Sequence, residues 1–196
     1  MKKLLVPALA LLLSGCWHVP VSALWRLSKV DTLAVDPAGV RLAGRIPDWI
    51  DVRSGQAHIK LVSHEGEPDA QERILDLVRD ESPNPRGLAD EAWAKTRFVV
   101  FRASAADVAW LRALQDRARA EKAAGESHKG RLLLTAEPCR RVDSPPPGPA
   151  RVDLYLQLGD NEDFFKIYDD VDLRDPAVLP NFDSVIPPCG KIAKRA

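Results

Sequence analysis

Short runs of apolar, β-branched and aromatic residues recur along the chain, and in several of them apolar and polar positions alternate. Alternation with a period of two is typical of a half-buried strand. Residues 164–168 follow an acidic turn and are expected to return as a hairpin partner of 151–158. The run at 73–78 is short, and we favour a strand there over a helical turn. The other predicted strands span residues 24–30, 40–46, 57–63, 97–102, 129–135 and 151–158.

One stretch has the spacing of an amphipathic helix. It opens on Ser104 and Asp107, an [ST]-x-x-[DE] pattern that satisfies free backbone donors at a helix start. Gly125 is suited to the position just after the last turn. We therefore expect a helix over about 104–122 that packs an apolar stripe on the sheet. The stripe consists of Val108, Leu111, Leu114 and Ala118.

The predicted fold class is α+β: a mostly antiparallel β-sheet or small sandwich, with one amphipathic helix (about 104–122) packed on it. The first three strands resemble a β-sandwich meander. The strand, helix and strand over 98–135 leave a right-handed parallel crossover open as an alternative. Sixteen prolines and eleven glycines favour a loop-rich fold over a helix bundle.

The N-terminus has the plan of a secretory signal. Lys2 and Lys3 precede an apolar run from Leu4 to Leu13, and two small residues and Cys16 follow. An apolar run of this length is too short to cross a bilayer as a helix. No other stretch approaches the length of apolar chain that a membrane span needs.

The motif LSGC at residues 13–16 resembles the lipobox of bacterial lipoproteins. The resemblance implies that residues 1–15 are a removable signal peptide and that Cys16 carries a diacylglyceryl thioether, with an amide-linked chain such as palmitate in many bacteria. Residues 16–23 are then a lipidated tether, and 24–196 form a single periplasmic domain. Two or more acyl chains anchor a protein stably. An ordinary signal peptide and an uncleaved anchor are the alternatives.

The same resemblance bears on location. In lipoproteins the residue after the lipidated cysteine influences sorting, and here it is Trp17 instead of the aspartate that marks inner-membrane retention. We therefore expect the chain in the cell envelope, facing the periplasm, at the outer membrane more than the inner. Trp17 and Trp25 lie near the anchor and are expected to touch the headgroup region, where tryptophan is enriched.

The charge balance does not suggest a nucleic-acid partner. The chain has 28 basic and 28 acidic residues, and removal of Lys2 and Lys3 leaves 26 against 28, a net charge of −2. Such a chain has neither the basic excess of a nucleic-acid binder nor a polybasic membrane patch. The expected partners are the membrane, through the lipid on Cys16, and an envelope protein.

Cys139 and Cys189 are the two cysteines beyond Cys16. In an oxidising periplasm an even pair is typical of a disulfide, and two free thiols are the alternative. Closing a loop of roughly 50 residues stabilises a fold by about 4 kcal/mol in the chain-entropy model. The bond is expected to tie the C-terminal tail to the body of the domain. No second Cys or His lies near either cysteine at ligand spacing, so we expect no metal there.

Metal ions and cofactors are not expected elsewhere either. His58 and His64 lie six residues apart on one predicted strand, about 20 Å, which is too far to share a metal. The acidic stretch at 160–175 offers oxygen ligands of the kind that calcium prefers. It lacks the glycine of an EF-hand loop, so we favour solvated acidic loops.

Catalysis has no support in a local motif. The sequence contains no G-x-S-x-G, no S-x-x-K outside the signal region and no Gly-rich phosphate loop. Catalytic groups can still assemble from distant positions, so an enzyme is left open but not favoured.

The segment LAGRIP at residues 42–47 is similar to small β-sandwich lipoproteins of the pilotin-like kind, although the long insert with its helix departs from that pattern. The leading hypothesis is a membrane-anchored envelope lipoprotein that acts by binding, as an accessory or scaffold of an envelope assembly. The alternative is a periplasmic carrier of a small apolar ligand or lipid, held in a pocket between sheet and helix. An enzyme of unknown class is third.

Overall fold

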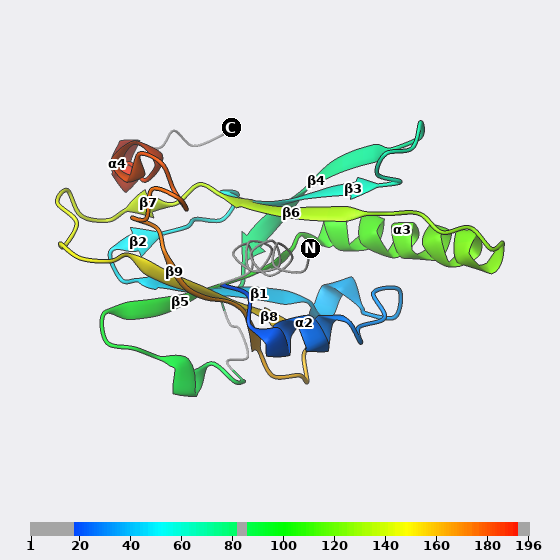
Figure 1. The fold of residues 1–196 in the computed structure, drawn as a ribbon, viewed down its shortest axis with the longest axis horizontal. Helices are drawn as coiled ribbons and strands as arrows, with labels where there is room; N and C mark the ends of the chain where they lie inside the picture. The colour runs from blue at the N-terminus through cyan, green and yellow to red at the C-terminus, as the bar shows by residue number, and fades with distance from the viewer. Residues whose placement is uncertain (1–17, 82–85, 192–196) are drawn as a thin grey trace, which may run out of the picture.

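A computed structural model describes residues 18–81 and 86–191, and in it the chain forms one seven-stranded sheet. The sheet curls into a half-barrel, and the long helix α3 (Ala105–Ala123) packs on it (Figure 1). The predicted α+β class, a mostly antiparallel sheet with one packed helix, is confirmed. Within the described ranges, no helix is both long enough and apolar enough to cross a bilayer.

Every pair of neighbouring strands in the sheet is antiparallel. A parallel crossover within 98–135 is therefore wrong, because the strand after α3 pairs antiparallel with β3. The strands predicted from residue 40 onward are confirmed, including the one at 73–78 and the hairpin partner at 164–168. In spatial order the strands are β6 (Arg131–Ala136), β3 (Ala57–Ser63), β4 (Gln71–Arg79), β5 (Thr96–Ala103), β1 (Arg41–Pro47), β8 (Arg151–Gln157) and β9 (Phe165–Asp172).

The predicted strand at 24–30 is wrong, because this segment forms helix α2 (Val21–Leu27). Pro20 stands at its N-cap with an extended backbone, and the Ser28 hydroxyl closes the last turn by donating to the carbonyl of Trp25. A run this short suits a strand and a helix equally well in isolation. Docking against β9 decided for the helix, and the expected three-strand meander does not form.

The predicted helix is confirmed as α3, with Ser104 as its N-cap. The Ser104 hydroxyl oxygen accepts a hydrogen bond from the backbone N–H of Asp107, which satisfies one of the free donors of the first turn. The buried Asp107 carboxylate accepts from the Arg73 guanidinium and from the backbone N–H of Asp76. The start of α3 is thereby bonded to β4.

Strands β1 and β5 are buried on both faces of the sheet. The alternation at 40–46 predicted a half-buried strand, and that expectation is wrong because Ala43 and Arg45 are buried as fully as their neighbours. One core, on the side of the C-terminal segment, contains Ile46, Ile50, Val52, Ala57, Leu77, Val99, Phe101 and Ile186. The other core contains Ala43, Leu88, Val100, Tyr155 and Phe164.

The C-terminal segment is tied back to the body of the domain. Two short strands, β2 (Ile50–Asp51) and β7 (Cys139–Arg140), form a ribbon beside it. The short helix α4 (Phe182–Val185) leads to Ile186, which is completely buried in the first core. The sulfurs of Cys139 and Cys189 lie 2.03 Å apart, as a disulfide.

Candidate functional site

Three large apolar side chains are exposed on one side of α2. Val21, Leu24 and Trp25 are 81%, 50% and 64% exposed. Their spacing of three and four residues places them side by side on the helix surface. Single exposed apolar residues are common on proteins, but a contiguous group marks a contact surface. We call these three residues the α2 apolar face.

The opposite side of α2 is fixed to the hairpin of β8 and β9. Ala23 is buried, and the Arg26 guanidinium lies 4.2 Å from the centre of the Phe165 ring. Arg26 also pairs with Glu162 at 3.3 Å. Figure 1 shows α2 lying against this edge of the sheet. The apolar face is thus presented outward on a helix whose orientation is set by the domain.

Residues 18–23 of the predicted tether, 16–23, are described, and His18 is hydrogen-bonded to β9. The backbone N–H of Asp169 donates to the carbonyl of His18 at 2.8 Å, and His18 Nδ1 lies 3.0 Å from the carbonyl oxygen of Asp169. Cys16 itself lies outside the described residues.

A buried ionic cluster lies on the other side of β1. Arg45 and Asp153 are only 1% and 2% exposed, and they form an ion pair. The Arg45 guanidinium donates to the carbonyl of Glu91 at 2.6 Å, and the Trp93 ring covers it at 3.4 Å. We call Arg45, Glu91, Trp93, Asp153 and Tyr155 the Arg45 cluster.

Two groups beside Arg45, Tyr155 and Lys166, have pKa values above their ordinary ones. Tyr155 donates its hydroxyl hydrogen to Glu91 at 3.0 Å, and burial raises the pKa of the phenol. Burial alone would lower the pKa of Lys166, but hydrogen bonds to Asp169 and Glu91 raise it above its ordinary value. A general acid or base works best with a pKa near the working pH. The hydrogen bond from Arg45 to the carbonyl of Glu91 holds the segment around Glu91 at the sheet.

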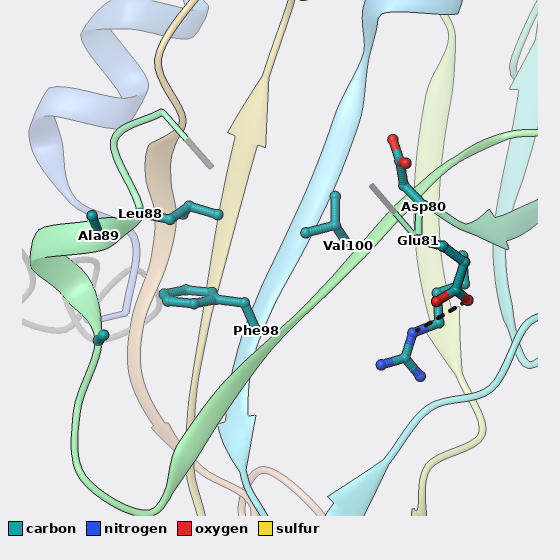
Figure 2. Close-up of a pocket in the computed structure, with 8 residues that line it drawn as sticks. Asp80, Glu81, Leu88, Ala89, Phe98 and Val100 are labelled. Atoms are coloured by element: carbon teal, nitrogen blue, oxygen red, sulfur yellow. Dashed lines mark ion pairs between the residues drawn. The ribbon is translucent and has the colours of Figure 1, made fainter. Parts of the chain in front are cut away.

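A partly apolar recess lies beside this segment, with a volume of about 290 Å³. Figure 2 shows Leu88 facing Phe98 and Val100 of β5, with Asp80 and Glu81 at its far side. Ligand pockets start at about 300 Å³. The recess lies between β5 and the 88–92 segment, whereas the pocket expected from the sequence was placed between sheet and helix.

The structure brings together two histidines that the sequence did not associate. His64 directly follows β3 and His128 precedes β6, and their rings stack with centres 4.0 Å apart. His58, the neighbour considered from the sequence, pairs instead with Asp76. The hydrogen bond to Asp69 raises the pKa of the His64 imidazole, and the bond to Glu67 does the same for His128.

The acidic stretch at 160–175 has basic partners along its length. Several carboxylates lie within ion-pair distance of an arginine or lysine, which reduces the charge that a calcium ion would neutralise. These pairs are Asp160 with Arg41, Glu162 with Arg26, Asp163 with Arg86, Asp169 with Lys166 and Asp170 with Arg151.

No protein-family model, curated protein or solved structure matches the chain. The α2 apolar face begins five residues after Cys16 in sequence, on a helix that contacts β9. This face is the candidate functional surface of the protein.

Proposed function

We propose that the protein is a cell-envelope lipoprotein, anchored through acyl chains on Cys16, that acts by binding as an accessory or scaffold of an envelope assembly. It faces the periplasm, with the outer membrane favoured over the inner. The observation that carries the proposal is the α2 apolar face, which starts five residues after Cys16 and is exposed on a helix docked to the domain.

The composition of this surface suits a membrane interface. Tryptophan is favoured at the headgroup level, and fully burying a valine or leucine gains about 1.5–3 kcal/mol. The ammonium group of Lys29 lies 3.4 Å from the centre of the Trp25 ring, so a positive charge borders the apolar face. A helix this short binds a bilayer weakly by itself, and the lipid on Cys16 supplies the main anchor.

The binding role draws support from the far edge of the sheet. In the order of the sheet, β6 stands at the opposite end from β9, the strand that α2 contacts. Leu132 and Leu133 are exposed on this edge strand, which among the described strands pairs only with β3. Edge strands with exposed apolar residues favour pairing with another chain. A partner strand that paired with β6 would extend the sheet at this edge.

Substituting Cys16 with alanine should abolish membrane anchoring. In phase separation with the detergent Triton X-114, the native chain is expected in the detergent phase and Cys16→Ala in the aqueous phase, because the variant has no acylation site. Crosslinking on isolated membranes should recover an envelope protein with the native chain and not with the variant.

Two outcomes would count against the proposal. Equal partitioning of the native chain and Cys16→Ala into the detergent phase would show that no lipid on Cys16 anchors the protein. If the native chain is anchored but crosslinks to no envelope protein, the lipid anchor is supported and the accessory role is contradicted.

The α2 apolar face is expected to contribute its own membrane affinity. For the unlipidated domain, starting at residue 17, Leu24→Ser/Trp25→Ser should lower the partition coefficient on anionic phospholipid vesicles about tenfold or more, since two apolar side chains leave the interface. Vesicle sedimentation measures this effect. The matched control is Leu132→Ser/Leu133→Ser, which changes a similar exposed pair on β6 and should bind as the unchanged domain does. Equal losses in the two variants would show that α2 has no special role.

A further inference from the structure

Two histidines and a glutamate from three separate segments converge beside the end of α3. His64 follows β3, Glu121 lies in the last turn of α3, and His128 lies in the connection to β6. We propose that these three side chains bind a divalent transition-metal ion of the zinc class, with Asp69 and Glu67 orienting the imidazoles. This inference is independent of the membrane proposal.

The donor atoms of the three side chains are already close together. Each residue offers one ligand atom, and the three atoms lie within 4.8 Å of one another. The imidazole rings stack at 4.0 Å with planes 22° apart, and all three residues are half-buried. Imidazole and carboxylate ligands at such spacing suit zinc, whose bonds to them are about 2.0–2.2 Å long.

The hydrogen bonds of the imidazoles select the tautomer that binds metal. His64 Nδ1 lies 2.7 Å from the Asp69 carboxylate, and His128 Nδ1 lies 2.9 Å from that of Glu67. A neutral imidazole that donates from Nδ1 keeps the Nε2 lone pair for a metal, and such carboxylate–histidine pairs accompany most histidine ligands. His64 Nε2 lies 3.5 Å from Glu121, the third proposed ligand.

The local charge also favours a cation. Four carboxylates lie within ion-pair distance of the two imidazoles: Glu67, Asp69, Glu121 and Glu126. With neutral imidazoles the group has a negative excess that a divalent ion offsets. Nitrogen ligands favour zinc, copper or nickel over calcium and magnesium, which prefer oxygen alone. Three protein ligands leave a fourth position for water or another ligand.

The backbone at His64 supports a built site. Its φ of 54° lies in the left-handed region, which non-glycine residues seldom adopt. Such conformations persist where the surroundings impose them, and they cluster at ligand sites. Here the turn directs the His64 ring onto His128 at the point where β3 ends.

His58 provides an internal comparison. Its Nδ1 also lies 3.0 Å from a carboxylate, that of Asp76. Among the described residues, however, the groups able to hold a metal ion include His64 and not His58. His58 therefore shares the histidine–carboxylate pair but lacks the convergent ligands.

The test is zinc binding by the purified full-length chain without a histidine tag, titrated against a chromophoric chelator. We expect one equivalent of Zn²⁺. His64→Ala and His128→Ala should each weaken binding by at least about 100-fold, and Asp69→Asn and Glu67→Gln by about 10- to 100-fold. His58→Ala should bind as the native chain does. Thermal melting of each variant without metal checks that it folds.

Several results would overturn the inference. These are a native chain that does not compete with the chelator for Zn²⁺, equal affinity in His64→Ala and the native chain, or an equal loss in His58→Ala. If an alanine variant fails to fold, X-ray absorption of the native chain with Zn²⁺ decides. Two imidazole nitrogens around the metal support the site, and oxygen ligands alone contradict it.

Discussion

Arg45→Met is expected to lower the free energy of unfolding by about 3–5 kcal/mol, because it leaves the Asp153 carboxylate buried without its cation. Asp153 keeps the hydrogen bond from the backbone N–H of Asp170, at 2.7 Å. The substitution also removes the contact with Trp93 and the hydrogen bond to the carbonyl of Glu91. Urea unfolding followed by tryptophan fluorescence measures the effect.

A matched surface pair and a double variant separate charge from packing. Arg151 pairs with Asp170 where both side chains are about half exposed, so Arg151→Met should cost no more than about 1 kcal/mol. Arg45→Met/Asp153→Leu replaces both buried charges and should be more stable than Arg45→Met alone. A cost below 1 kcal/mol for Arg45→Met, or a double variant weaker than the single one, would contradict this account.

Cys139→Ala/Cys189→Ala is expected to lower the free energy of unfolding by about 4 kcal/mol in the chain-entropy model, because the bond closes a loop across 50 positions of sequence. The loss should begin at the C-terminal segment. Ile186 is completely buried there, and the backbone N–H of Arg140 donates to the carbonyl of Pro187. Urea unfolding gives the free energy, and hydrogen exchange should be faster at the amides of residues 186, 189 and 190, since Pro187 and Pro188 have no amide hydrogen.

Reductant supplies the control for the disulfide. It should destabilise the native chain and leave the double alanine variant unchanged. Alkylation of the unreduced, unfolded native chain should modify neither Cys139 nor Cys189. Modification of both, or equal unfolding midpoints with and without reductant, would show two free thiols.

Local chemistry explains why much of the fold was predictable. Apolar and polar residues alternate at 151–158 because the side chains of β8 alternate between buried and less buried positions. The helix start at Ser104 was readable because a cap needs only residues within one turn. The same reasoning failed at α2, where a short run had no local preference and contact with β9 decided the conformation.

The buried arginine shows a second limit. In the sequence, Arg45 stands at one of the polar positions of an alternating strand, and such a position indicates a solvent-facing side chain. Its burial depends on the Glu91–Trp93 segment folding over β1 and on Asp153 from β8. Those partners are distant in sequence, so the local pattern holds no information about them.

By itself, the sequence determined the positions of most strands, the long helix with its cap, the even pair of cysteines beyond Cys16 and the lipobox-like start, because these depend on nearby residues. Only the tertiary structure decided the outward apolar face of α2, the Arg45 cluster and the meeting of His64 with His128. The histidines could be paired only once β3 and β6 were known to be antiparallel neighbours, since that register alone brings the end of one strand to the start of the other. Long-range pairing depends on all strands together, and no short stretch encodes it.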